Sequence, residues 1–254
     1  MTALPPNAAG ALIAFSTNTW ASPLAHLRIL SPANYAGIQV LQGSQEGQIF
    51  TEKVAQAGLV WIQRDFPRHG KAYEHILSLA RQQGKPLIYD LDDLLLELPD
   101  DHPDRLNYYY DAALLPMLRA LIEANLVTVS TAPLRDYALR FNPNVRVLPN
   151  YLDADIWKPF KTPKAPGQAA SPLVIAYMGG PSHTPDLSSI GQALRSLARR
   201  YGSRIRLHFL GSRPPVELLE ETNCSWQASP TFEYRKFAAF LADQDYDICF
   251  APLK

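Results

Sequence analysis

The chain has 254 residues, of which 47% are hydrophobic and 19% charged, a composition typical of a globular protein rather than a disordered or membrane-spanning one. Its 24 lysines and arginines balance 24 aspartates and glutamates, so it lacks the basic footprint usual in nucleic-acid-binding proteins. Because it has no apolar run of about 18 residues and no basic leader, we expect a cytoplasmic protein without a transmembrane segment or nucleic-acid partner, and leave peripheral membrane contact open.

Six short apolar runs alternate with helical patterns in the first 157 residues. The runs are apolar nearly throughout, which is typical of parallel strands covered on both faces. Between two of them, Lys71–Gln83 carries its apolar residues on one helix face and is followed by Gly84, a helix stop. This alternation predicts a doubly wound α/β sheet. The runs are Ala11–Phe15, Gly37–Leu41, Leu59–Gln63, Pro86–Leu91, Leu126–Ser130 and Val145–Pro149.

The segment Lys158–Pro172 interrupts this pattern with four prolines and no apolar periodicity, and we predict an interdomain linker there. Residues 1–157 then form the first domain and residues 173–254 a second α/β domain. The second domain has about three expected strands, whereas a doubly wound sheet usually has more, so we predict that it is incomplete. Its expected elements are the strands Leu173–Met178, Ile205–Leu210 and Tyr246–Ala251 and a helix near Phe232–Ala242.

Cys224 and Cys249 are the only cysteines, and neither has the spacing of a metal ligand. We predict two buried, reduced thiols, with neither a disulfide framework nor a zinc site.

Two glycines follow the first strand of the second domain, in the run Tyr177–Asp186. Thr184 is a suitable N-cap and Pro185 fits the first helical position. Glycines let a ligand approach the backbone, and a helix N-terminus offers free N–H groups, so the turn suits a diphosphate. An ordinary tight strand-to-helix connection is the alternative. The run is neither the G-x-G-x-x-G fingerprint of nicotinamide and flavin enzymes nor a Walker A sequence.

Three carboxylates, Asp90, Asp92 and Asp93, stand at the end of a buried strand, and we expect them at the exposed carboxyl edge of the sheet. An Asp-x-Asp pair can bind a metal and nucleotide in GT-A glycosyltransferases, or supply the nucleophile of haloacid-dehalogenase-like phosphatases. Both interpretations fit poorly with a motif that follows the fourth strand of a sheet. The phosphatases also have Thr or Val at the position of Leu94 and carry the motif on the first strand.

A third interpretation rests on strand order. If the order is 3-2-1-4-5-6, the loop Ser16–Asn18 after the first strand faces the same crevice as the carboxylates. They would there bind an acceptor hydroxyl, orient a cation or act as a base. Capping of the following helix and local salt bridges are the alternative.

Two further residues are candidates by position. Asn150 ends the last strand of the first domain, just ahead of the linker, where a ligand bridging the domains would touch it. Arg64 ends the third strand and could contact phosphate. The alternatives are a plain turn and a solvated rim side chain.

In this order, these segments resemble GT-B glycosyltransferases of the large retaining, family-4-like group found in bacterial polysaccharide gene clusters. The resemblance covers nearly the whole chain, and its specificity lies in the ordered set. The matching pieces are Leu27–Pro32, Val60–Arg64, Gly84–Asp93, Ala124–Thr131, Leu148–Asn150, Tyr177–Gly180 with His183 and Asp186, and Asp245–Leu253.

The resemblance implies two Rossmann-like lobes, a nucleoside-diphosphate-sugar donor on the second and a glycan, lipid-linked or protein acceptor on the first. It implies no cofactor and no bound metal. The loop holding the donor phosphates is matched by Gly179, Gly180 and His183, and the expected catalytic residues are Asp90 and Asp92. The residues expected to bind substrate are Ser16, Asn18, Arg28, Arg64, Asp93 and Asn150.

The sequence departs from this family at two places. The loop Ser16–Trp20 replaces a glycine-rich loop, and the family's Glu-x7-Glu segment, expected after Leu253, is absent from the 254 residues. We therefore expect a glycosyltransferase, or a fragment of one, with little activity as this chain. The alternative is a non-catalytic GT-B-like binding or scaffold module.

Overall fold

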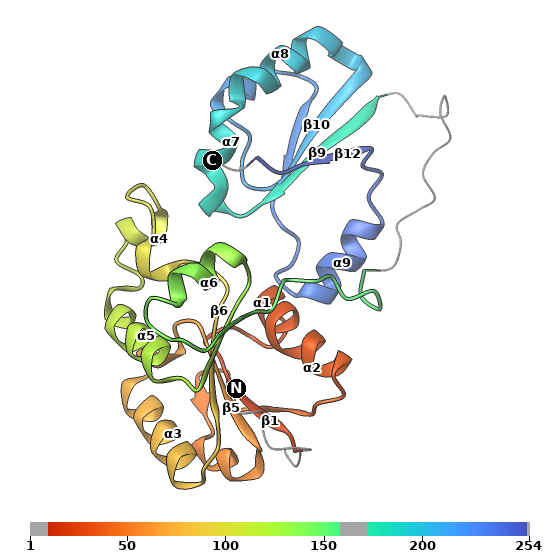
Figure 1. Cartoon of the computed structure of the whole chain (residues 1–254). Coiled ribbons are helices and arrows are strands. Elements are labelled where there is room, and N and C mark those ends of the chain that lie inside the picture. The colour runs from red at the N-terminus through yellow and green to blue at the C-terminus, as the bar shows by residue number, and fades with distance from the viewer. Residues whose placement is uncertain (1–9, 158–171, 253–254) are drawn as a thin grey trace. The chain divides into compact units, whose positions relative to one another are not determined.

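The computed structural model describes residues 10–157 and 172–252, which divide into two compact units, Met1–Asp153 and Ala154–Lys254 (Figure 1). The predicted linker, except for Pro172, lies outside the described residues. Among the described residues no helix is long and apolar enough to cross a membrane. Each unit is an α/β structure around its own parallel sheet, so the predicted fold class is confirmed.

The first unit contains six parallel strands in the order β2-β1-β5-β6-β7-β8. The predicted order 3-2-1-4-5-6 is wrong, because the third strand in the chain, β5, pairs with β1. The direction of strand order therefore reverses between β1 and β5. All six match predicted runs; their bounds are β1 Leu12–Phe15, β2 Val40–Gln42, β5 Leu59–Gln63, β6 Leu87–Leu91, β7 Leu126–Val129 and β8 Val145–Val147.

Helices cover both faces of this sheet, as apolar residues on both faces of the strands require. On one face, side chains of β1, β5, β6 and β7 pack on α3 (Gly70–Gln82), α5 (Asp111–Glu123) and α6 (Ala132–Ala138). On the other, the π-helical turn η1 (His26–Leu30) and α2 (Ser31–Tyr35) supply Ile29 and Ala33. The remaining elements are α1 (Pro23–Ala25), the hairpin β3 (Ser44–Gln45) and β4 (Gln48–Ile49), η2 (Thr51–Gln56), η3 (Phe66–Arg68), η4 (Leu95–Glu97) and α4 (Pro103–Leu106).

The second unit contains four parallel strands in the order β11-β10-β9-β12, so strand order reverses between β9 and β12. The sequence predicts three of these strands; the fourth, β11, is short and carries polar residues, so it has no apolar run. The bounds are β9 Leu173–Gly179, β10 Ile205–Gly211, β11 Cys224–Gln227 and β12 Ile248–Phe250. The prediction of two buried thiols is wrong, because Cys224 is half-buried and Cys249, on the edge strand β12, is exposed.

The helices of the second unit are α7 (Thr184–Ser189), α8 (Gly191–Tyr201) and α9 (Tyr234–Ala242). The predicted N-cap, Thr184, is instead the first residue of α7 and follows His183, and a break at Ile190 separates α7 from α8, which ends at Tyr201. Leu194 and Ala198 of α8 pack on Ile175, Leu207 and other strand residues of one sheet face. The short 3-10 turns are η5 (Pro181–His183), η6 (Gly202–Arg204) and η7 (Val216–Leu218).

Candidate functional site

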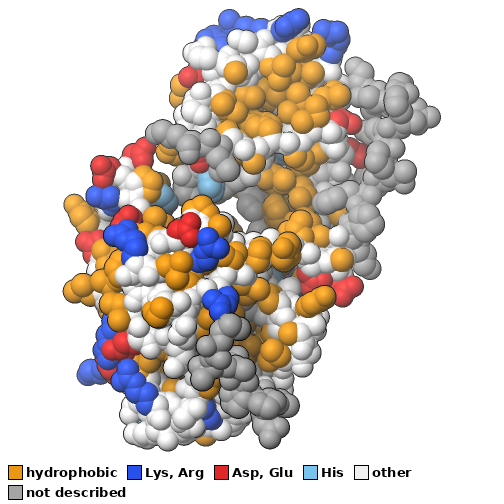
Figure 2. All heavy atoms as spheres, in the orientation of Figure 1, with side chains coloured by type: hydrophobic (Ala, Val, Ile, Leu, Met, Phe, Trp, Pro, Cys, Tyr) orange, Lys and Arg blue, Asp and Glu red, His pale blue; other side chains and the backbone are white. Residues whose placement is uncertain are grey.

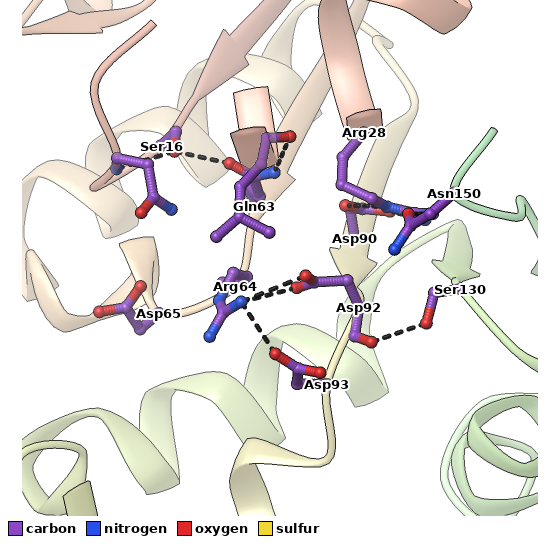
Figure 3. Close-up of polar contacts among 12 residues, drawn as sticks. Ser16, Arg28, Gln63, Arg64, Asp65, Asp90, Asp92, Asp93, Ser130 and Asn150 are labelled. Atoms are coloured by element: carbon purple, nitrogen blue, oxygen red, sulfur yellow. Dashed lines mark hydrogen bonds and ion pairs between the residues drawn. The ribbon is translucent and has the colours of Figure 1, made fainter. Parts of the chain in front are cut away.

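Polar residues gather at the carboxyl edge of the first sheet, where the apolar strands end. β5 ends at Gln63 and continues into Arg64, and β6 ends in Asp90 and Leu91 before Asp92 and Asp93. Since neighbouring parallel strands end at the same edge, their terminal side chains converge. Figure 3 shows Arg28 reaching from η1 toward Asp90, with Asp92 and Asp93 turned toward Arg64.

Arg28 and Asp90 form an ion pair that is completely buried. The Arg28 Nη2 and Nε atoms donate to Asp90 Oδ1 and Oδ2 at 2.6 and 3.1 Å, and the Thr128 hydroxyl donates to Oδ1 at 2.6 Å. Both carboxylate oxygens of Asp90 are thus bound within the protein. The prediction that Asp90 lies at an exposed edge is wrong, because its paired carboxylate can be buried where an unpaired one could not.

The remaining guanidinium nitrogen of Arg28 binds the segment that follows β8. Nη1 donates to the Leu148 carbonyl and, at 3.0 Å, to Asn150 Oδ1. Arg28 therefore joins η1, β6 and the segment after β8. The Nη1 hydrogen bond holds the side chain of Asn150, an exposed residue.

Arg64 is held in a strained backbone conformation with φ +49°. Its Nη1 lies 3.0 Å from Asp92 Oδ1 and 3.2 Å from Asp93 Oδ2, and its Nη2 donates to the Tyr110 hydroxyl at 3.2 Å. The Tyr89 hydroxyl donates to the Arg64 carbonyl at 2.9 Å and fixes the same backbone. These contacts hold the guanidinium at the edge despite the strain.

The two carboxylates around Arg64 differ in exposure. The side chain of Asp92 is 5% exposed and that of Asp93 is 63% exposed. Burial raises the pKa of Asp92 to about 6, against the opposing charge of Arg64. Burial opposes the charge on Arg64 as well, but Asp92, Tyr110 and Asp93 outweigh it and keep its pKa above the usual value. Asp93 is therefore the carboxylate of this group that a solute can reach, and the predicted exposed position is wrong for Asp92 as well as for Asp90.

The loop after β1 is tied to β5 rather than directly to β6. The Ser16 hydroxyl donates to Gln63 Oε1 at 2.6 Å and accepts the Asn18 N–H at 3.0 Å. Ser16 is buried, while Asn18 is half-buried. Gln63, absent from the predicted site, connects the loop with the β5 end; its signal was a lone polar residue closing an apolar run.

In the second unit, the Gly179–Gly180 turn lies at the carboxyl end of β9, beside the point where strand order reverses. The Ser212 hydroxyl donates to both glycine carbonyls, at 3.1 and 2.6 Å, and the Ser212 N–H donates to the Gly179 carbonyl at 2.8 Å. Gly211 has φ +88°, and a Cβ there would meet the Gly179 carbonyl oxygen at 2.4 Å. The turn therefore depends on close contact between the backbone at Gly179 and the backbone at Gly211.

Gly211→Ala should lower the free energy of unfolding by more than the roughly 1–3 kcal/mol of a strained dihedral, because its Cβ also collides with backbone. Gly84→Ala is the control: φ is +62° there, and an added Cβ meets nothing within 4 Å. Urea unfolding followed by circular dichroism measures both. Equal losses for the two variants would show that the contact with Gly179 does not constrain the turn.

His183 follows the turn, and its Nδ1–H donates to Asp186 Oδ2, 3.0 Å away. The His183 side chain is 52% exposed and that of Asp186 is 18% exposed. The third predicted phosphate-binding residue is thus accessible and oriented by a carboxylate. Among the described residues, no group of three or more His, Cys, Asp or Glu side chains is arranged to hold a metal ion.

No family model and no curated protein matches the sequence. Solved structures do: S. aureus MnaA in complex with UDP, 11% identical, matches with a TM-score of 0.44 over 91% of this chain and 70% of its own. Trehalose-6-phosphate synthase OtsA is 13% identical, with a TM-score of 0.46 over 77% of this chain and 52% of its own. Arabidopsis thaliana UGT89C1 complexed with UDP-L-rhamnose is 10% identical, with a TM-score of 0.41 over 86% and 62%.

The chain spans 52% to 70% of the lengths of these structures. At such identities and TM-scores they carry no functional argument, and function must be inferred from the residues of this chain. The structure brings together Arg28 with Asp90 and Asn150, and Arg64 with Asp92 and Asp93, as two linked groups of predicted residues.

Proposed function

We propose that the protein is a glycosyltransferase of the GT-B type, or part of one, whose second unit binds a nucleoside-diphosphate-sugar donor. The supporting observation is the Gly179–Gly180 turn at the strand-order reversal of the second sheet. In open parallel α/β sheets, ligands bind outside the carboxyl ends of strands at this point. A turn without side chains leaves room for a phosphate group there.

One N–H of the turn points away from Ser212. Ser212 binds the carbonyl of the Gly179–Gly180 peptide, and in a planar trans peptide the Gly180 N–H points the opposite way. This N–H would donate to a diphosphate oxygen, and the exposed His183 ring would supply a second donor from Nε2 when both of its ring nitrogens are protonated. Donors fixed before the reaction stabilise the charge that develops on the departing diphosphate.

The first unit would bind a glycan, lipid-linked or protein acceptor at its carboxyl edge. Asp93 would orient an acceptor hydroxyl, with Asn150 and Asn18 as further contacts, because these side chains are exposed or half-buried. Arg28, Arg64, Asp90, Asp92 and Ser16 would position them. Because of the sequence resemblance, the proposal also includes retention of the anomeric configuration, a cytoplasmic location and a role in polysaccharide biosynthesis. It includes no metal and no cofactor.

Gly180→Val should weaken UDP binding about 10- to 100-fold without loss of fold, since a Cβ at Gly180 meets only Ser182 Oγ, at 4.0 Å, but stands where the diphosphate would lie. Isothermal titration of UDP into the wild type and the variant measures this. Gly70→Val is the matched control, because its Cβ also enters open space. Wild-type protein that does not bind UDP, or a variant that binds it equally well, would contradict the proposal.

A non-catalytic binding module is the second candidate. It is favoured by the side chain of Asp90, a predicted catalytic residue whose carboxylate is 0% exposed and bound on both oxygens. Incubation with UDP-sugars and an acceptor panel separates the two functions. UDP binding without sugar transfer or donor hydrolysis supports the module, whereas turnover supports the transferase.

A further inference from the structure

A cavity of about 520 Å³ opens in the first unit between η4, α4 and the start of α5. This volume lies within the range of small-molecule sites, about 300–1,000 Å³. Its apolar wall is formed by leucines, including the buried Leu95 and the partly buried Leu98 and Leu114. Open space over such a wall favours an apolar ligand, because its entry would remove leucine surface from water.

The polar lining of the cavity is predominantly acidic. It has three carboxylates, Glu97, Asp104 and Asp111, and one cation, Arg105. Arg105 is already engaged: it pairs with Asp100 at 2.8 Å and donates to the Leu98 carbonyl at 2.5 Å. Glu97 pairs with Arg140 at 3.9 Å, and Asp104 lies 4.0 Å from His102 Nδ1, so the negative charge facing a ligand comes mainly from Asp104 and Asp111. In Figure 2, hydrophobic and acidic side chains lie side by side over α4, at the left of the first unit.

The acidic residues have a structural role too, but it does not account for the cavity. Asp104 and Asp111 lie in the first turns of α4 and α5, where a negative charge complements the helix N-terminus. Helix stability needs no open apolar wall beside them. Exposed apolar side chains also occur on and between the helices that border the cavity: Leu106 of α4 is 62% exposed, Tyr108 74% and Leu115 of α5 77%.

The side chain of Tyr110 connects the cavity with Arg64 and its carboxylate partners. Tyr110 lines the cavity and accepts the hydrogen bond from Arg64 Nη2 at 3.2 Å. Tyr110 is only 8% exposed and contacts both Arg64 and the cavity. A ligand in the cavity would therefore contact the ring that supports Arg64.

We propose that this cavity binds a cationic amphiphile, a small molecule with an apolar group of the size of a phenylbutyl chain and one ammonium group. The apolar group lies on the leucine wall formed by Leu95, Leu98 and Leu114. The ammonium group lies between the Asp104 and Asp111 carboxylates. Charge complementarity selects the cation over a neutral or anionic ligand of the same shape. This site does not require that the protein transfers sugars.

Three probes with one skeleton test the site: 4-phenylbutylamine, 4-phenyl-1-butanol and 4-phenylbutyrate, titrated at pH 7 into the full chain. Backbone amide shifts of residues 95–114 in ¹⁵N-resolved spectra report binding. The amine should bind about tenfold more tightly than the alcohol, and the carboxylate should bind more weakly than both. Alcohol or carboxylate binding as tight as the amine, or amine-induced shifts only elsewhere, would overturn the proposal.

Variants separate charge from shape. Asp104→Asn with Asp111→Asn should reduce the preference for amine over alcohol to about twofold while alcohol binding stays unchanged. Leu114→Trp should fill the cavity and abolish binding of both, with the amide spectrum showing that the fold remains. Glu46→Gln, an exposed charge change in the β3–β4 turn, is the control and should alter nothing. An unchanged preference in the double variant would refute the assigned position of the ammonium group.

Discussion

Arg28→Met should lower the free energy of unfolding of the first unit by about 3–5 kcal/mol, the usual cost of leaving one partner of a buried ion pair behind. Methionine keeps most of the length of the side chain but leaves Asp90 charged and completely buried. It also removes the donor to the Leu148 carbonyl and Asn150. Urea unfolding at pH 7, followed by circular dichroism, measures the loss.

Two further variants show whether the buried charge is the cause. Arg28→Met combined with Asp90→Asn should recover part of the loss, because the amide carries no charge and can still accept from Thr128. Arg135→Met removes an exposed partner of Asp136 and should cost at most about 1 kcal/mol. A loss below about 1 kcal/mol for Arg28→Met alone would mean that the pair does not hold η1 to the sheet.

The strands and main helix of the first unit are predictable because burial on both faces leaves a continuous apolar run. The predicted run Leu59–Gln63 is a strand with the same bounds, and the predicted run Pro86–Leu91 is a strand that begins one residue later, at Leu87. Their order is not predictable in this way, because a strand that pairs with β1 looks the same as one that pairs with β2. The polar β11 shows the other limit: an edge strand need not be apolar.

The candidate site was predictable in composition but not in burial. Carboxylates closing a strand indicate a polar edge, and the structure places Asp92 and Asp93 there beside Arg64. The partner of Asp90 lies 62 residues away in the chain, on a π-helical turn that no local pattern indicates. The positive φ of Arg64 is equally invisible, since non-glycine residues rarely adopt it. Long-range pairing therefore decides which predicted residues are accessible.

Asp92→Asn should become progressively more stable relative to the wild type as the pH rises from 4 to 7, by about 2–3 kcal/mol in total. Burial raises the pKa of Asp92 from 3.8 to about 6, so between these values the folded state holds a proton that the unfolded state has released. The contribution of this carboxyl to stability is full below pH 3.8, falls as the pH rises to about 6 and is level above it. Each pKa unit corresponds to about 1.36 kcal/mol.

At pH 4 the protonated Asp92 resembles asparagine, so the two proteins should have similar stability there. At pH 7 the wild type carries at residue 92 a buried negative charge that the Arg64 guanidinium offsets only in part, whereas the variant carries no charge at that residue. Urea unfolding at four pH values between 4 and 7 gives the difference. Ser130→Ala, which removes the hydroxyl donor to the Asp92 carbonyl, should differ from the wild type by a constant amount. A pH-independent difference for Asp92→Asn would show that Arg64 compensates the burial of Asp92 completely.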